Sequence, residues 1–489
     1  MKKYPLLIAL SVLLASCGGG RHSEVQISDE SELPGHSVVT LAGSCYDIDL
    51  SPREDINLVR VNTAADALQS LVNGKAQVLV CDEITYNSTV LRENGVKIAC
   101  LGKAEFPTAF MFRKGDVALA SACTSTIEEM EADGSMEELK DYWLTERYLE
   151  SGKFRTVPQE GTGEPIKVAC AADMAPIAFP VEGEWYGLEV DILRRMANEL
   201  GRKIEFTFYP PTSAVIALPA GLADVLLGAI FITPEREEEN LFSKPYHNYH
   251  PAYFVLDPEA AGEGAGFWDG LKKGLHKTFI VENRWKYITK GLGETVKITL
   301  LSILFGAVLG AGLSAMMRSR RKWLRCVAGA YNWLIAGIPM LVLLLILFYI
   351  VFAGTGLDVS TVAIIAFAMN FASGAADVYN TSLDAIPSTQ TEGGLALGFT
   401  KVQTFRHIIL PQALRRGLPL FQAQCISLLK ATSIVGYISL EDITRAGDII
   451  RSRTFDAVMP LLVVTVVYFI LAWAIGLLLK FALPKKSVL

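Results

Sequence analysis

The chain has 489 residues, a formal net charge of −6 and 51% hydrophobic residues. Its length allows two or three domains, and its slightly acidic balance gives no reason to expect a nucleic-acid partner. The hydrophobic residues are unevenly spread, because residues 18–290 have the mixed composition of a soluble α/β protein whereas long apolar runs begin near Thr295. The composition therefore divides the chain into a soluble half and a membrane half.

The first residues have the pattern of an export signal. Two lysines precede an apolar stretch, Leu6 to Leu14, that is too short for a standard transmembrane helix. The residues that end it, Leu14-Ala15-Ser16-Cys17, resemble a bacterial lipobox, in which the cysteine carries lipid. We expect a lipoprotein-type signal peptide with Cys17 as the lipid attachment, and an ordinary secretory signal is the alternative. Both place the next domain outside the cytoplasm.

The five cysteines of the exported half have no CxxC pair and no spacing typical of a metal site. We expect most of them to be small buried apolar residues, and we predict no metal site. They are Cys45, Cys81, Cys100, Cys123 and Cys170.

Residues 35–150 begin with a pattern of strands and helices. Val38 to Ser44 is a strand-like run that ends in Gly-Ser, and Ala65 to Glu83 predicts a helix, a turn and a buried strand. Ile127 to Leu144 predicts a pair of helices. This order resembles the closing portion of a type 2 amino-acid-binding protein of solute-binding family 3, which is the second lobe followed by the final helices.

Residues 166–257 resemble the opening portion of the same family. Gly187 to Gly201 has apolar residues at intervals of three and four, which predicts a helix that ends at its last glycine. The motif Thr-x-x-Arg236, followed by Phe-Ser-x-Pro-Tyr246, is specific to this family. The resemblance implies that Arg236 holds the ligand α-carboxylate, whose two oxygens a guanidinium can pair at once. It also implies that backbone groups near Ala229 and Phe231 help.

The two portions occur in reversed order and complement each other with little overlap. We expect one circularly permuted domain joined by a linker, and the alternatives are two degenerate half-domains or halves exchanged with a second copy. If the portions close on each other, the resemblance implies that Asp82 receives the ligand ammonium opposite Arg236, while Ser44 caps the carboxylate. Met174 stands where the family commonly has a stacking tyrosine, so Met174 and Asp173 are pocket candidates and the substrate stays open.

Five apolar segments follow, and most are long enough to cross about 30 Å of hydrocarbon. The basic clusters at 318–325, 401–416 and 485–486 fall on one side if the chain enters from outside and crosses five times. Lys430 lies within the fourth segment, where it is either a functional residue or a lysine that snorkels to the membrane surface. The segments are 294–317, 328–352, 360–380, 416–438 and 458–482.

The loop between the third and fourth segments reads Glu392-Gly-Gly-Leu-Ala-Leu-Gly398 and continues to Pro411. It resembles the EAA loop of ABC-importer permeases, with Gly393 and Gly394 in place of the two alanines. The resemblance implies a short helix that docks on a cytoplasmic ATPase, a sharp turn at Gly398, and a stop at Pro411 before the next helix begins.

Over residues 285–484 the resemblance narrows to permeases for polar amino acids, the His/Glu/Gln/Arg/opine group. No GxxxxGK[ST] phosphate loop occurs, so we expect ATP and Mg²⁺ to be used by a separate ABC ATPase dimer, with no cofactor and no enzymatic activity on this chain. The motifs that carry the resemblance are Gly291-Leu-x-x-Thr295, Gly337-Ile-Pro-Met-Leu341 and Leu429-Lys-x-Thr-Ser433.

We therefore expect an α/β two-lobe periplasmic-binding-protein-like domain and an all-α polytopic membrane domain with five transmembrane helices. Five spans are too few for a complete pathway, so we expect a dimer, most simply of this chain with itself. The expected function is import of an amino acid through a bacterial cytoplasmic (inner) membrane, with the binding domain outside; a ligand-gated ion channel is the alternative. The expected divisions are 1–17 (signal), 24–150 (second lobe and closing helices), 151–165 (linker), 166–257 (opening lobe), 258–290 (linker and pre-membrane helix) and 291–484 (permease).

Overall fold

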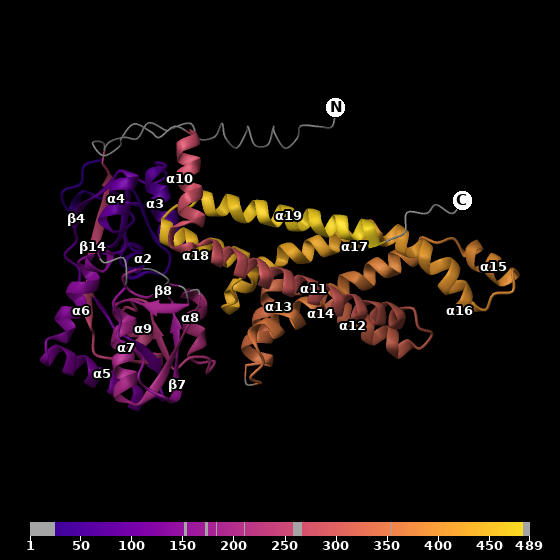
Figure 1. The fold of residues 1–489 in the computed structure, drawn as a ribbon, viewed down its shortest axis with the longest axis horizontal. Coiled ribbons are helices and arrows are strands. Elements are labelled where there is room, and N and C mark those ends of the chain that lie inside the picture. Colours follow the sequence, from indigo (N-terminus) through magenta and orange to yellow (C-terminus); the bar gives the residue numbers. More distant parts are fainter. Residues whose placement is uncertain are drawn as a thin grey trace.

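The computed structural model describes residues 25–150, 154–171, 175–181, 183–209, 211–257, 267–353 and 355–482. A two-lobed α/β domain lies at one end of the molecule, and long helices extend away from it (Figure 1). The predicted signal peptide with Cys17 and the pocket candidates Asp173 and Met174 lie outside the described residues.

The second lobe is built on a five-stranded sheet in the order β2-β1-β3-β14-β4. Strand β1 pairs in parallel with β2 and β3, whereas β14, from the end of the exported half, runs antiparallel between β3 and β4. Four consecutive residues of β3 are buried, which is typical of a strand covered on both faces. The elements are β1 (Ser37–Leu41), α2 (Cys45–Leu50), β2 (Asn57–Val61), α3 (Ala64–Val72), β3 (Val78–Asp82), α4 (Ser88–Asn94), β4 (Val96–Leu101) and β14 (Pro251–Leu256).

The opening lobe is built on a second five-stranded sheet, in the order β10-β7-β11-β6-β12. Strands β10, β7 and β11 are parallel, and β6 runs antiparallel to both of its neighbours, β11 and β12. The elements are β6 (Met111–Arg113), α5 (Val117–Ala132), α6 (Ser135–Leu144), β7 (Gly163–Cys170), β8 (Phe179–Val181), β9 (Glu184–Tyr186), α7 (Leu188–Glu199), β10 (Arg202–Phe208), α8 (Pro211–Ala217), β11 (Val225–Leu227), α9 (Pro234–Glu239) and β12 (Asn240–Phe242).

Two short strands connect the lobes, β5 (Phe106–Thr108) and β13 (His247–Tyr249), and they pair with each other. Each large sheet combines strands from residues 37–113 with strands from residues 163–256. The two portions of the exported half therefore form one two-lobed domain within a single chain. This arrangement favours a permuted domain over two separate half-domains.

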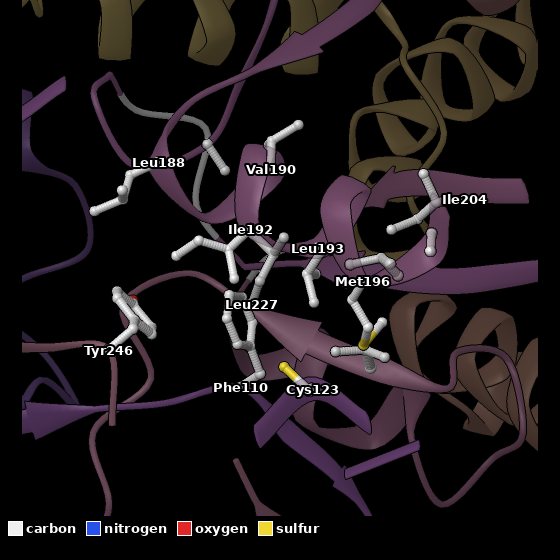
Figure 2. Packing of buried hydrophobic residues seen from close by; sticks show 14 of the residues in the cluster. Phe110, Cys123, Leu188, Val190, Ile192, Leu193, Met196, Ile204, Leu227 and Tyr246 are labelled. Atoms are coloured by element: carbon white, nitrogen blue, oxygen red, sulfur yellow. The ribbon is translucent and has the colours of Figure 1, made fainter. Parts of the chain in front are cut away.

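The core of the opening lobe explains how its two portions are held together. Leu188, Ile192 and Met196 recur on one face of α7 and are fully buried, as the periodicity predicts. Figure 2 shows these side chains in the same cluster as Phe110 and Tyr246, whose ring centroids are 5.1 Å apart. Since Phe110 comes from the first portion and α7 from the second, the hydrophobic core itself joins them.

Among the described residues, four helical stretches are long and apolar enough to cross a membrane, and one bent pair of helices adds a fifth span if the pair is counted as one. The first, third, fourth and fifth predicted segments correspond to α11 (Trp285–Met317), α14 (Val359–Asp384), the stretch Lys401–Ile438 and α19 (Met459–Ala482).

The second predicted segment, 328–352, is a bent pair of helices and counts as a span only if the pair is taken as one. The chain forms α12 (Lys322–Gly337) and α13 (Met340–Ile346), which continues into a π-helical turn over Leu347–Val351, and the pair bends by 106°. Pro339 lies at the bend, where its ring and missing N–H prevent the helix from continuing.

Small residues let α11 and α14 approach closely. A Cβ atom added at Gly310 of α11 would lie 2.8 Å from both the Ala372 carbonyl oxygen and the Ala375 Cβ of α14. Close packing of this kind is a principal source of helix association in lipid. The buried small residues of α11 recur every four positions, at Ser302, Gly306, Gly310 and Ser314.

The end of the helical part opposite the binding domain carries α15 (Ser388–Ala396) and α16 (Lys401–Thr404) (Figure 1). Gly398 between them has φ +86°, which is the sharp turn expected there. The expectation that Pro411 stops a helix is wrong. A π-helical turn over Phe405–Ile409 leads without a break into α17 (Leu410–Ala431), so the change in hydrogen-bond pattern just before Pro411 lets the helix continue past the proline.

Two further helices lie where the binding domain meets the spans (Figure 1). Helix α10 (Phe267–Phe279) packs on the start of α19, since a Cβ at its Gly274 would lie 3.0 Å from Met459. Helix α18 (Ile443–Thr454) connects the 3-10 helix that follows α17 to α19.

Candidate functional site

Aromatic side chains from both lobes meet beside the connecting strands. Phe231, which follows β11 of the opening lobe, packs edge-on against Tyr46 of α2 and Phe106 of β5, with ring centroids 6.0 and 5.9 Å away. Tyr249 of β13 contacts the same ring at 6.3 Å. The predicted site residue Phe231 therefore lies between the lobes, among aromatic neighbours that the sequence analysis does not single out.

Arg236 lies on α9, a short helix capped by the side chain of Thr233. Its Nη1 donates a hydrogen bond to the backbone oxygen of Phe231 at 3.0 Å. Burial lowers the pKa of Arg236. Phe231, which holds the Arg236 side chain through this hydrogen bond, is the residue that contacts Tyr46 of the second lobe.

Asp82 is the last residue of β3, and local donors hold its carboxylate. It accepts hydrogen bonds from Thr85 Oγ1 at 2.8 Å and from the Ile84 amide at 3.2 Å. Burial raises the pKa of Asp82, and the charge of Asp82 in turn adds to the burial that raises the pKa of Cys45. Asp82 and Arg236 lie on opposite lobes, and no direct ion pair joins them among the described contacts, so their joint role in binding a solute stays a prediction.

Ser44 serves as the N-cap of α2, which is a structural role. Its Oγ accepts a hydrogen bond from the Asp47 amide at 3.1 Å and donates to the Leu41 carbonyl oxygen at 2.7 Å. The neighbouring amide of Gly43 donates to the Asp47 carboxylate at 2.9 Å. The donors that were expected to cap a ligand carboxylate are thus engaged within the chain, and the binding role of Ser44 stays a prediction.

Ala229 has an unusual backbone for a residue with a side chain, with φ +52°. Its amide donates to Glu189 Oε1 of α7 at 2.8 Å, and the same oxygen accepts a hydrogen bond from the Tyr246 hydroxyl. Burial raises the pKa of Glu189 to about 7. Glu189 and Tyr246 thus brace the loop that leads to Phe231. In the sequence, Glu189 could have been found as an acid in the helix predicted over Gly187 to Gly201, and Tyr246 as the tyrosine that ends the family motif.

Three buried polar atoms at the lobe junction have no hydrogen-bond partner among the described residues: the hydroxyls of Tyr46 and Tyr249, and Glu189 Oε2. Burial raises the pKa of Tyr249, and both Glu189 and Asp82 add to that shift. Because buried polar groups are normally paired, these atoms favour a polar solute in the same region.

The predicted coupling loop presents an apolar tip. Gly394 is buried on α15, where a Cβ would lie 2.5 Å from Thr404 Cγ2, whereas Gly393 faces open space and Glu392 is exposed. Leu397 and Val402 beside the turn are 78% and 75% exposed. Exposed apolar side chains in this position suit a protein partner.

Comparison with known proteins identifies the family. The chain is 30% identical over 202 residues to the probable amino-acid ABC transporter permease protein YckA of Bacillus subtilis, a match that covers 41% of this chain and 88% of that protein. It is also 30% identical over 200 residues to the L-cystine transport system permease protein TcyB of Bacillus subtilis, with 40% and 86% covered. The chain belongs to the amino-acid ABC transporter permease family.

The permease also carries a solute-binding domain. Residues 166–396 match the model of bacterial extracellular solute-binding proteins, family 3, and this match begins within β7 of the opening lobe. The crystal structure of an amino acid ABC transporter with histidines is 28% identical, has a TM-score of 0.39, and covers 45% of this permease and 98% of its own chain.

Lys430 of the permease is exposed on the last turn of α17, on the side of the chain that leads to α18. Its position near the end of the helix suits a snorkelling lysine, whereas a lysine within a spanning segment is also a candidate functional residue. Both interpretations of Lys430 stay open.

Proposed function

We propose that this permease is the combined solute-binding and membrane subunit of an ATP-driven importer of amino acids. The observation that carries the proposal is the placement of its two working surfaces. The two-lobed domain lies at one end of the spanning helices, and the loop of α15 and α16 lies at the other (Figure 1). An importer requires a binding site on one side of the membrane and an ATPase contact on the other.

The charges at the lobe junction suit an α-amino acid. Arg236 lies on the opening lobe and Asp82 on the second lobe, so a carboxylate and an ammonium would each find an opposite charge when the lobes close on a solute. Closure of the lobes would remove the solute from water and strengthen both interactions.

Two further parts complete the proposed transporter. A separate ABC ATPase dimer would use ATP and Mg²⁺ and bind the exposed tip around Leu397. A second permease copy would complete the pathway that five spans leave open. In a bacterial inner membrane, the binding domain would face outside and the tip would face the cytoplasm, in keeping with the basic clusters.

Reconstitution tests the proposal. Each of the standard L-amino acids is first screened for the rise that it causes in the unfolding temperature of the full chain. The amino acid with the largest rise should stimulate ATP hydrolysis by proteoliposomes that contain the permease and its ATPase. An ionic current induced by that amino acid without nucleotide would contradict the proposal and support a ligand-gated channel.

Substitution of the two charges tests the site. Arg236→Ala and Asp82→Ala should each weaken amino-acid binding to the full chain by ~2–4 kcal/mol, because each leaves a desolvated charge without its partner. Isothermal titration measures the affinity. The matched control is Arg155→Ala, since Arg155 pairs with Glu138 on an exposed surface and its loss should leave the affinity unchanged. Equal affinities for all three variants would refute the assignment.

A further inference from the structure

Helix α18 of the permease contacts the opening lobe near its first turn. The guanidinium carbon of Arg445 lies 3.4 Å from the ring centroid of Phe208, the last residue of β10. This short distance is a close cation–π contact. It joins the opening-lobe sheet directly to the segment between two membrane spans.

The other end of α18 contacts the second lobe. Arg451 forms an ion pair with Asp66 on α3, and its side chain is only 15% exposed. Phe455, directly after α18, is buried in the second-lobe core, with its ring centroid 5.1 Å from that of Tyr86. A residue of the membrane half, Phe455, thus forms part of the hydrophobic core of the binding domain.

The start of α18 is fixed to the membrane helices. The Ile443 amide donates a hydrogen bond to Thr295 Oγ1 of α11 at 3.1 Å, and the Tyr468 hydroxyl of α19 donates to the Asp442 carboxylate at 3.1 Å. A Cβ at Gly291 of α11 would lie 2.6 Å from the Asp442 carbonyl oxygen, so the two backbones touch. Movement of α18 therefore moves α11 or α19 or breaks these contacts.

A small cavity lies where the end of α18 meets both lobes. Its volume is about 110 Å³, and Thr85 of the second lobe, Phe179 of the opening lobe, and Arg453 and Phe455 of the permease line it. Thr85 also donates to the Asp82 carboxylate. Thr85 therefore borders the cavity at the end of α18 and also holds the carboxylate of Asp82, a predicted solute-binding residue.

We propose that α18 senses the separation of the two lobes of its own binding domain, with Phe208 and Asp66 as the lobe residues through which it does so. Arg445 and Arg451 are six residues apart on one helix, which is ~9 Å at 1.5 Å per residue. A helix of this length does not stretch, so a change in lobe separation must break one contact or displace α18. The displacement passes to α11 and α19 through Thr295 and Tyr468. This inference rests on the proposed import function.

Two substitutions on the lobes test the inference while leaving α18 and its membrane contacts intact. Phe208→Leu removes the π face and keeps an apolar side chain, and Asp66→Asn removes the charge and keeps the hydrogen-bond acceptor. Each variant should still bind the amino acid selected in the thermal screen. In proteoliposomes with the ATPase, each should reduce the stimulation of ATP hydrolysis by that amino acid about fivefold or more, the usual scale of coupling between sites.

The matched control is Glu93→Gln. Glu93 of the second lobe pairs with Lys277 on α10, so this ion pair links the binding domain to the membrane half through a contact to which α18 contributes no residue. This variant should keep full stimulation. Normal stimulation in both Phe208→Leu and Asp66→Asn would overturn the inference, and an equal loss in Glu93→Gln would show that docking in general, rather than α18, carries the signal.

Hydrogen exchange over residues 443–454 supplies a readout that needs no ATPase. The selected amino acid should change exchange there in the unaltered chain and should not do so in Phe208→Leu. An unchanged rate in the unaltered chain would overturn the inference even if the chain imports amino acids. Absence of amino-acid binding or of stimulation in the unaltered chain would instead refute the proposed function.

Discussion

The carboxyl group of Glu189 is buried at the lobe junction, where its described hydrogen-bond partners are the Tyr246 hydroxyl and the Ala229 amide. Neither partner is a cation, so desolvation dominates and raises its pKa to about 7 from an ordinary value of 4.5. The folded protein therefore binds this proton more tightly than the unfolded chain does. The contribution to stability is fully present below pH 4.5 and is lost as the pH rises through about 7.

Glu189→Gln should remove this pH dependence. The unaltered protein should lose on the order of 3 kcal/mol of this contribution between pH 4.5 and 8. The reason is that the pKa of Glu189 is about 2.5 higher in the folded than in the unfolded chain, and a pKa difference of 1 corresponds to about 1.36 kcal/mol. The amide does not titrate, so the variant should show a flatter curve of unfolding temperature against pH. Thermal unfolding of the full chain in detergent across that range measures both curves. If the unfolding temperatures of the variant and of the unaltered protein change equally with pH, Glu189 is not the source of the pH dependence.

At the scale of elements, local sequence controls where helices turn, and close packing controls how they associate. Gly398 makes the turn between α15 and α16, and Pro339 marks the bend between α12 and α13. Gly306 and Gly310 instead act between elements, because they bring the backbone of α11 next to α14. The free energy of this association depends on the absence of side chains at those positions.

Gly310→Val should separate α11 from α14 and lower the stability of the helical part by ~1–3 kcal/mol, the usual cost of overpacking. The unfolding temperature of the detergent-solubilised chain measures the loss. Gly312→Val on the same helix is the matched control, because an added Cβ there meets no atom within 4 Å. Equal unfolding temperatures for the two variants would contradict the packing argument.

At the scale of the whole molecule, the binding domain and the α15–α16 tip lie at opposite ends (Figure 1). Two clusters of basic residues flank the spans at the tip end, one after α11 and one around α16. Under the positive-inside rule these clusters favour the proposed topology, in which the tip faces the cytoplasm and the lobes face outside.

Cysteine labelling in intact cells should report this orientation. With the exposed Cys326 replaced by serine, Lys103→Cys should react with an impermeant maleimide, because the Lys103 side chain is 91% exposed on the second lobe. Leu397→Cys, at a position that is 78% exposed, should react only after the cells are opened. Labelling of both positions from outside would invert or break the proposed topology.

Hydropathy, charge and short motifs are local properties, so the chain alone is sufficient to predict the soluble and membrane halves, the helix α7, the turn at Gly398 and the family resemblance. The bend at Pro339 and the continuous helix through Pro411 depend on how hydrogen bonds re-form around each proline, which a motif does not reveal. Arg236 and Asp82 lie on opposite lobes, and their shared role in binding stays a prediction, whereas the contacts of Glu189 with Ala229 and Tyr246 come from tertiary packing. The contact between Arg451 and Asp66 joins residues 385 positions apart. No local pattern encodes such a pair, because it exists only once both lobes and the spans have folded against each other.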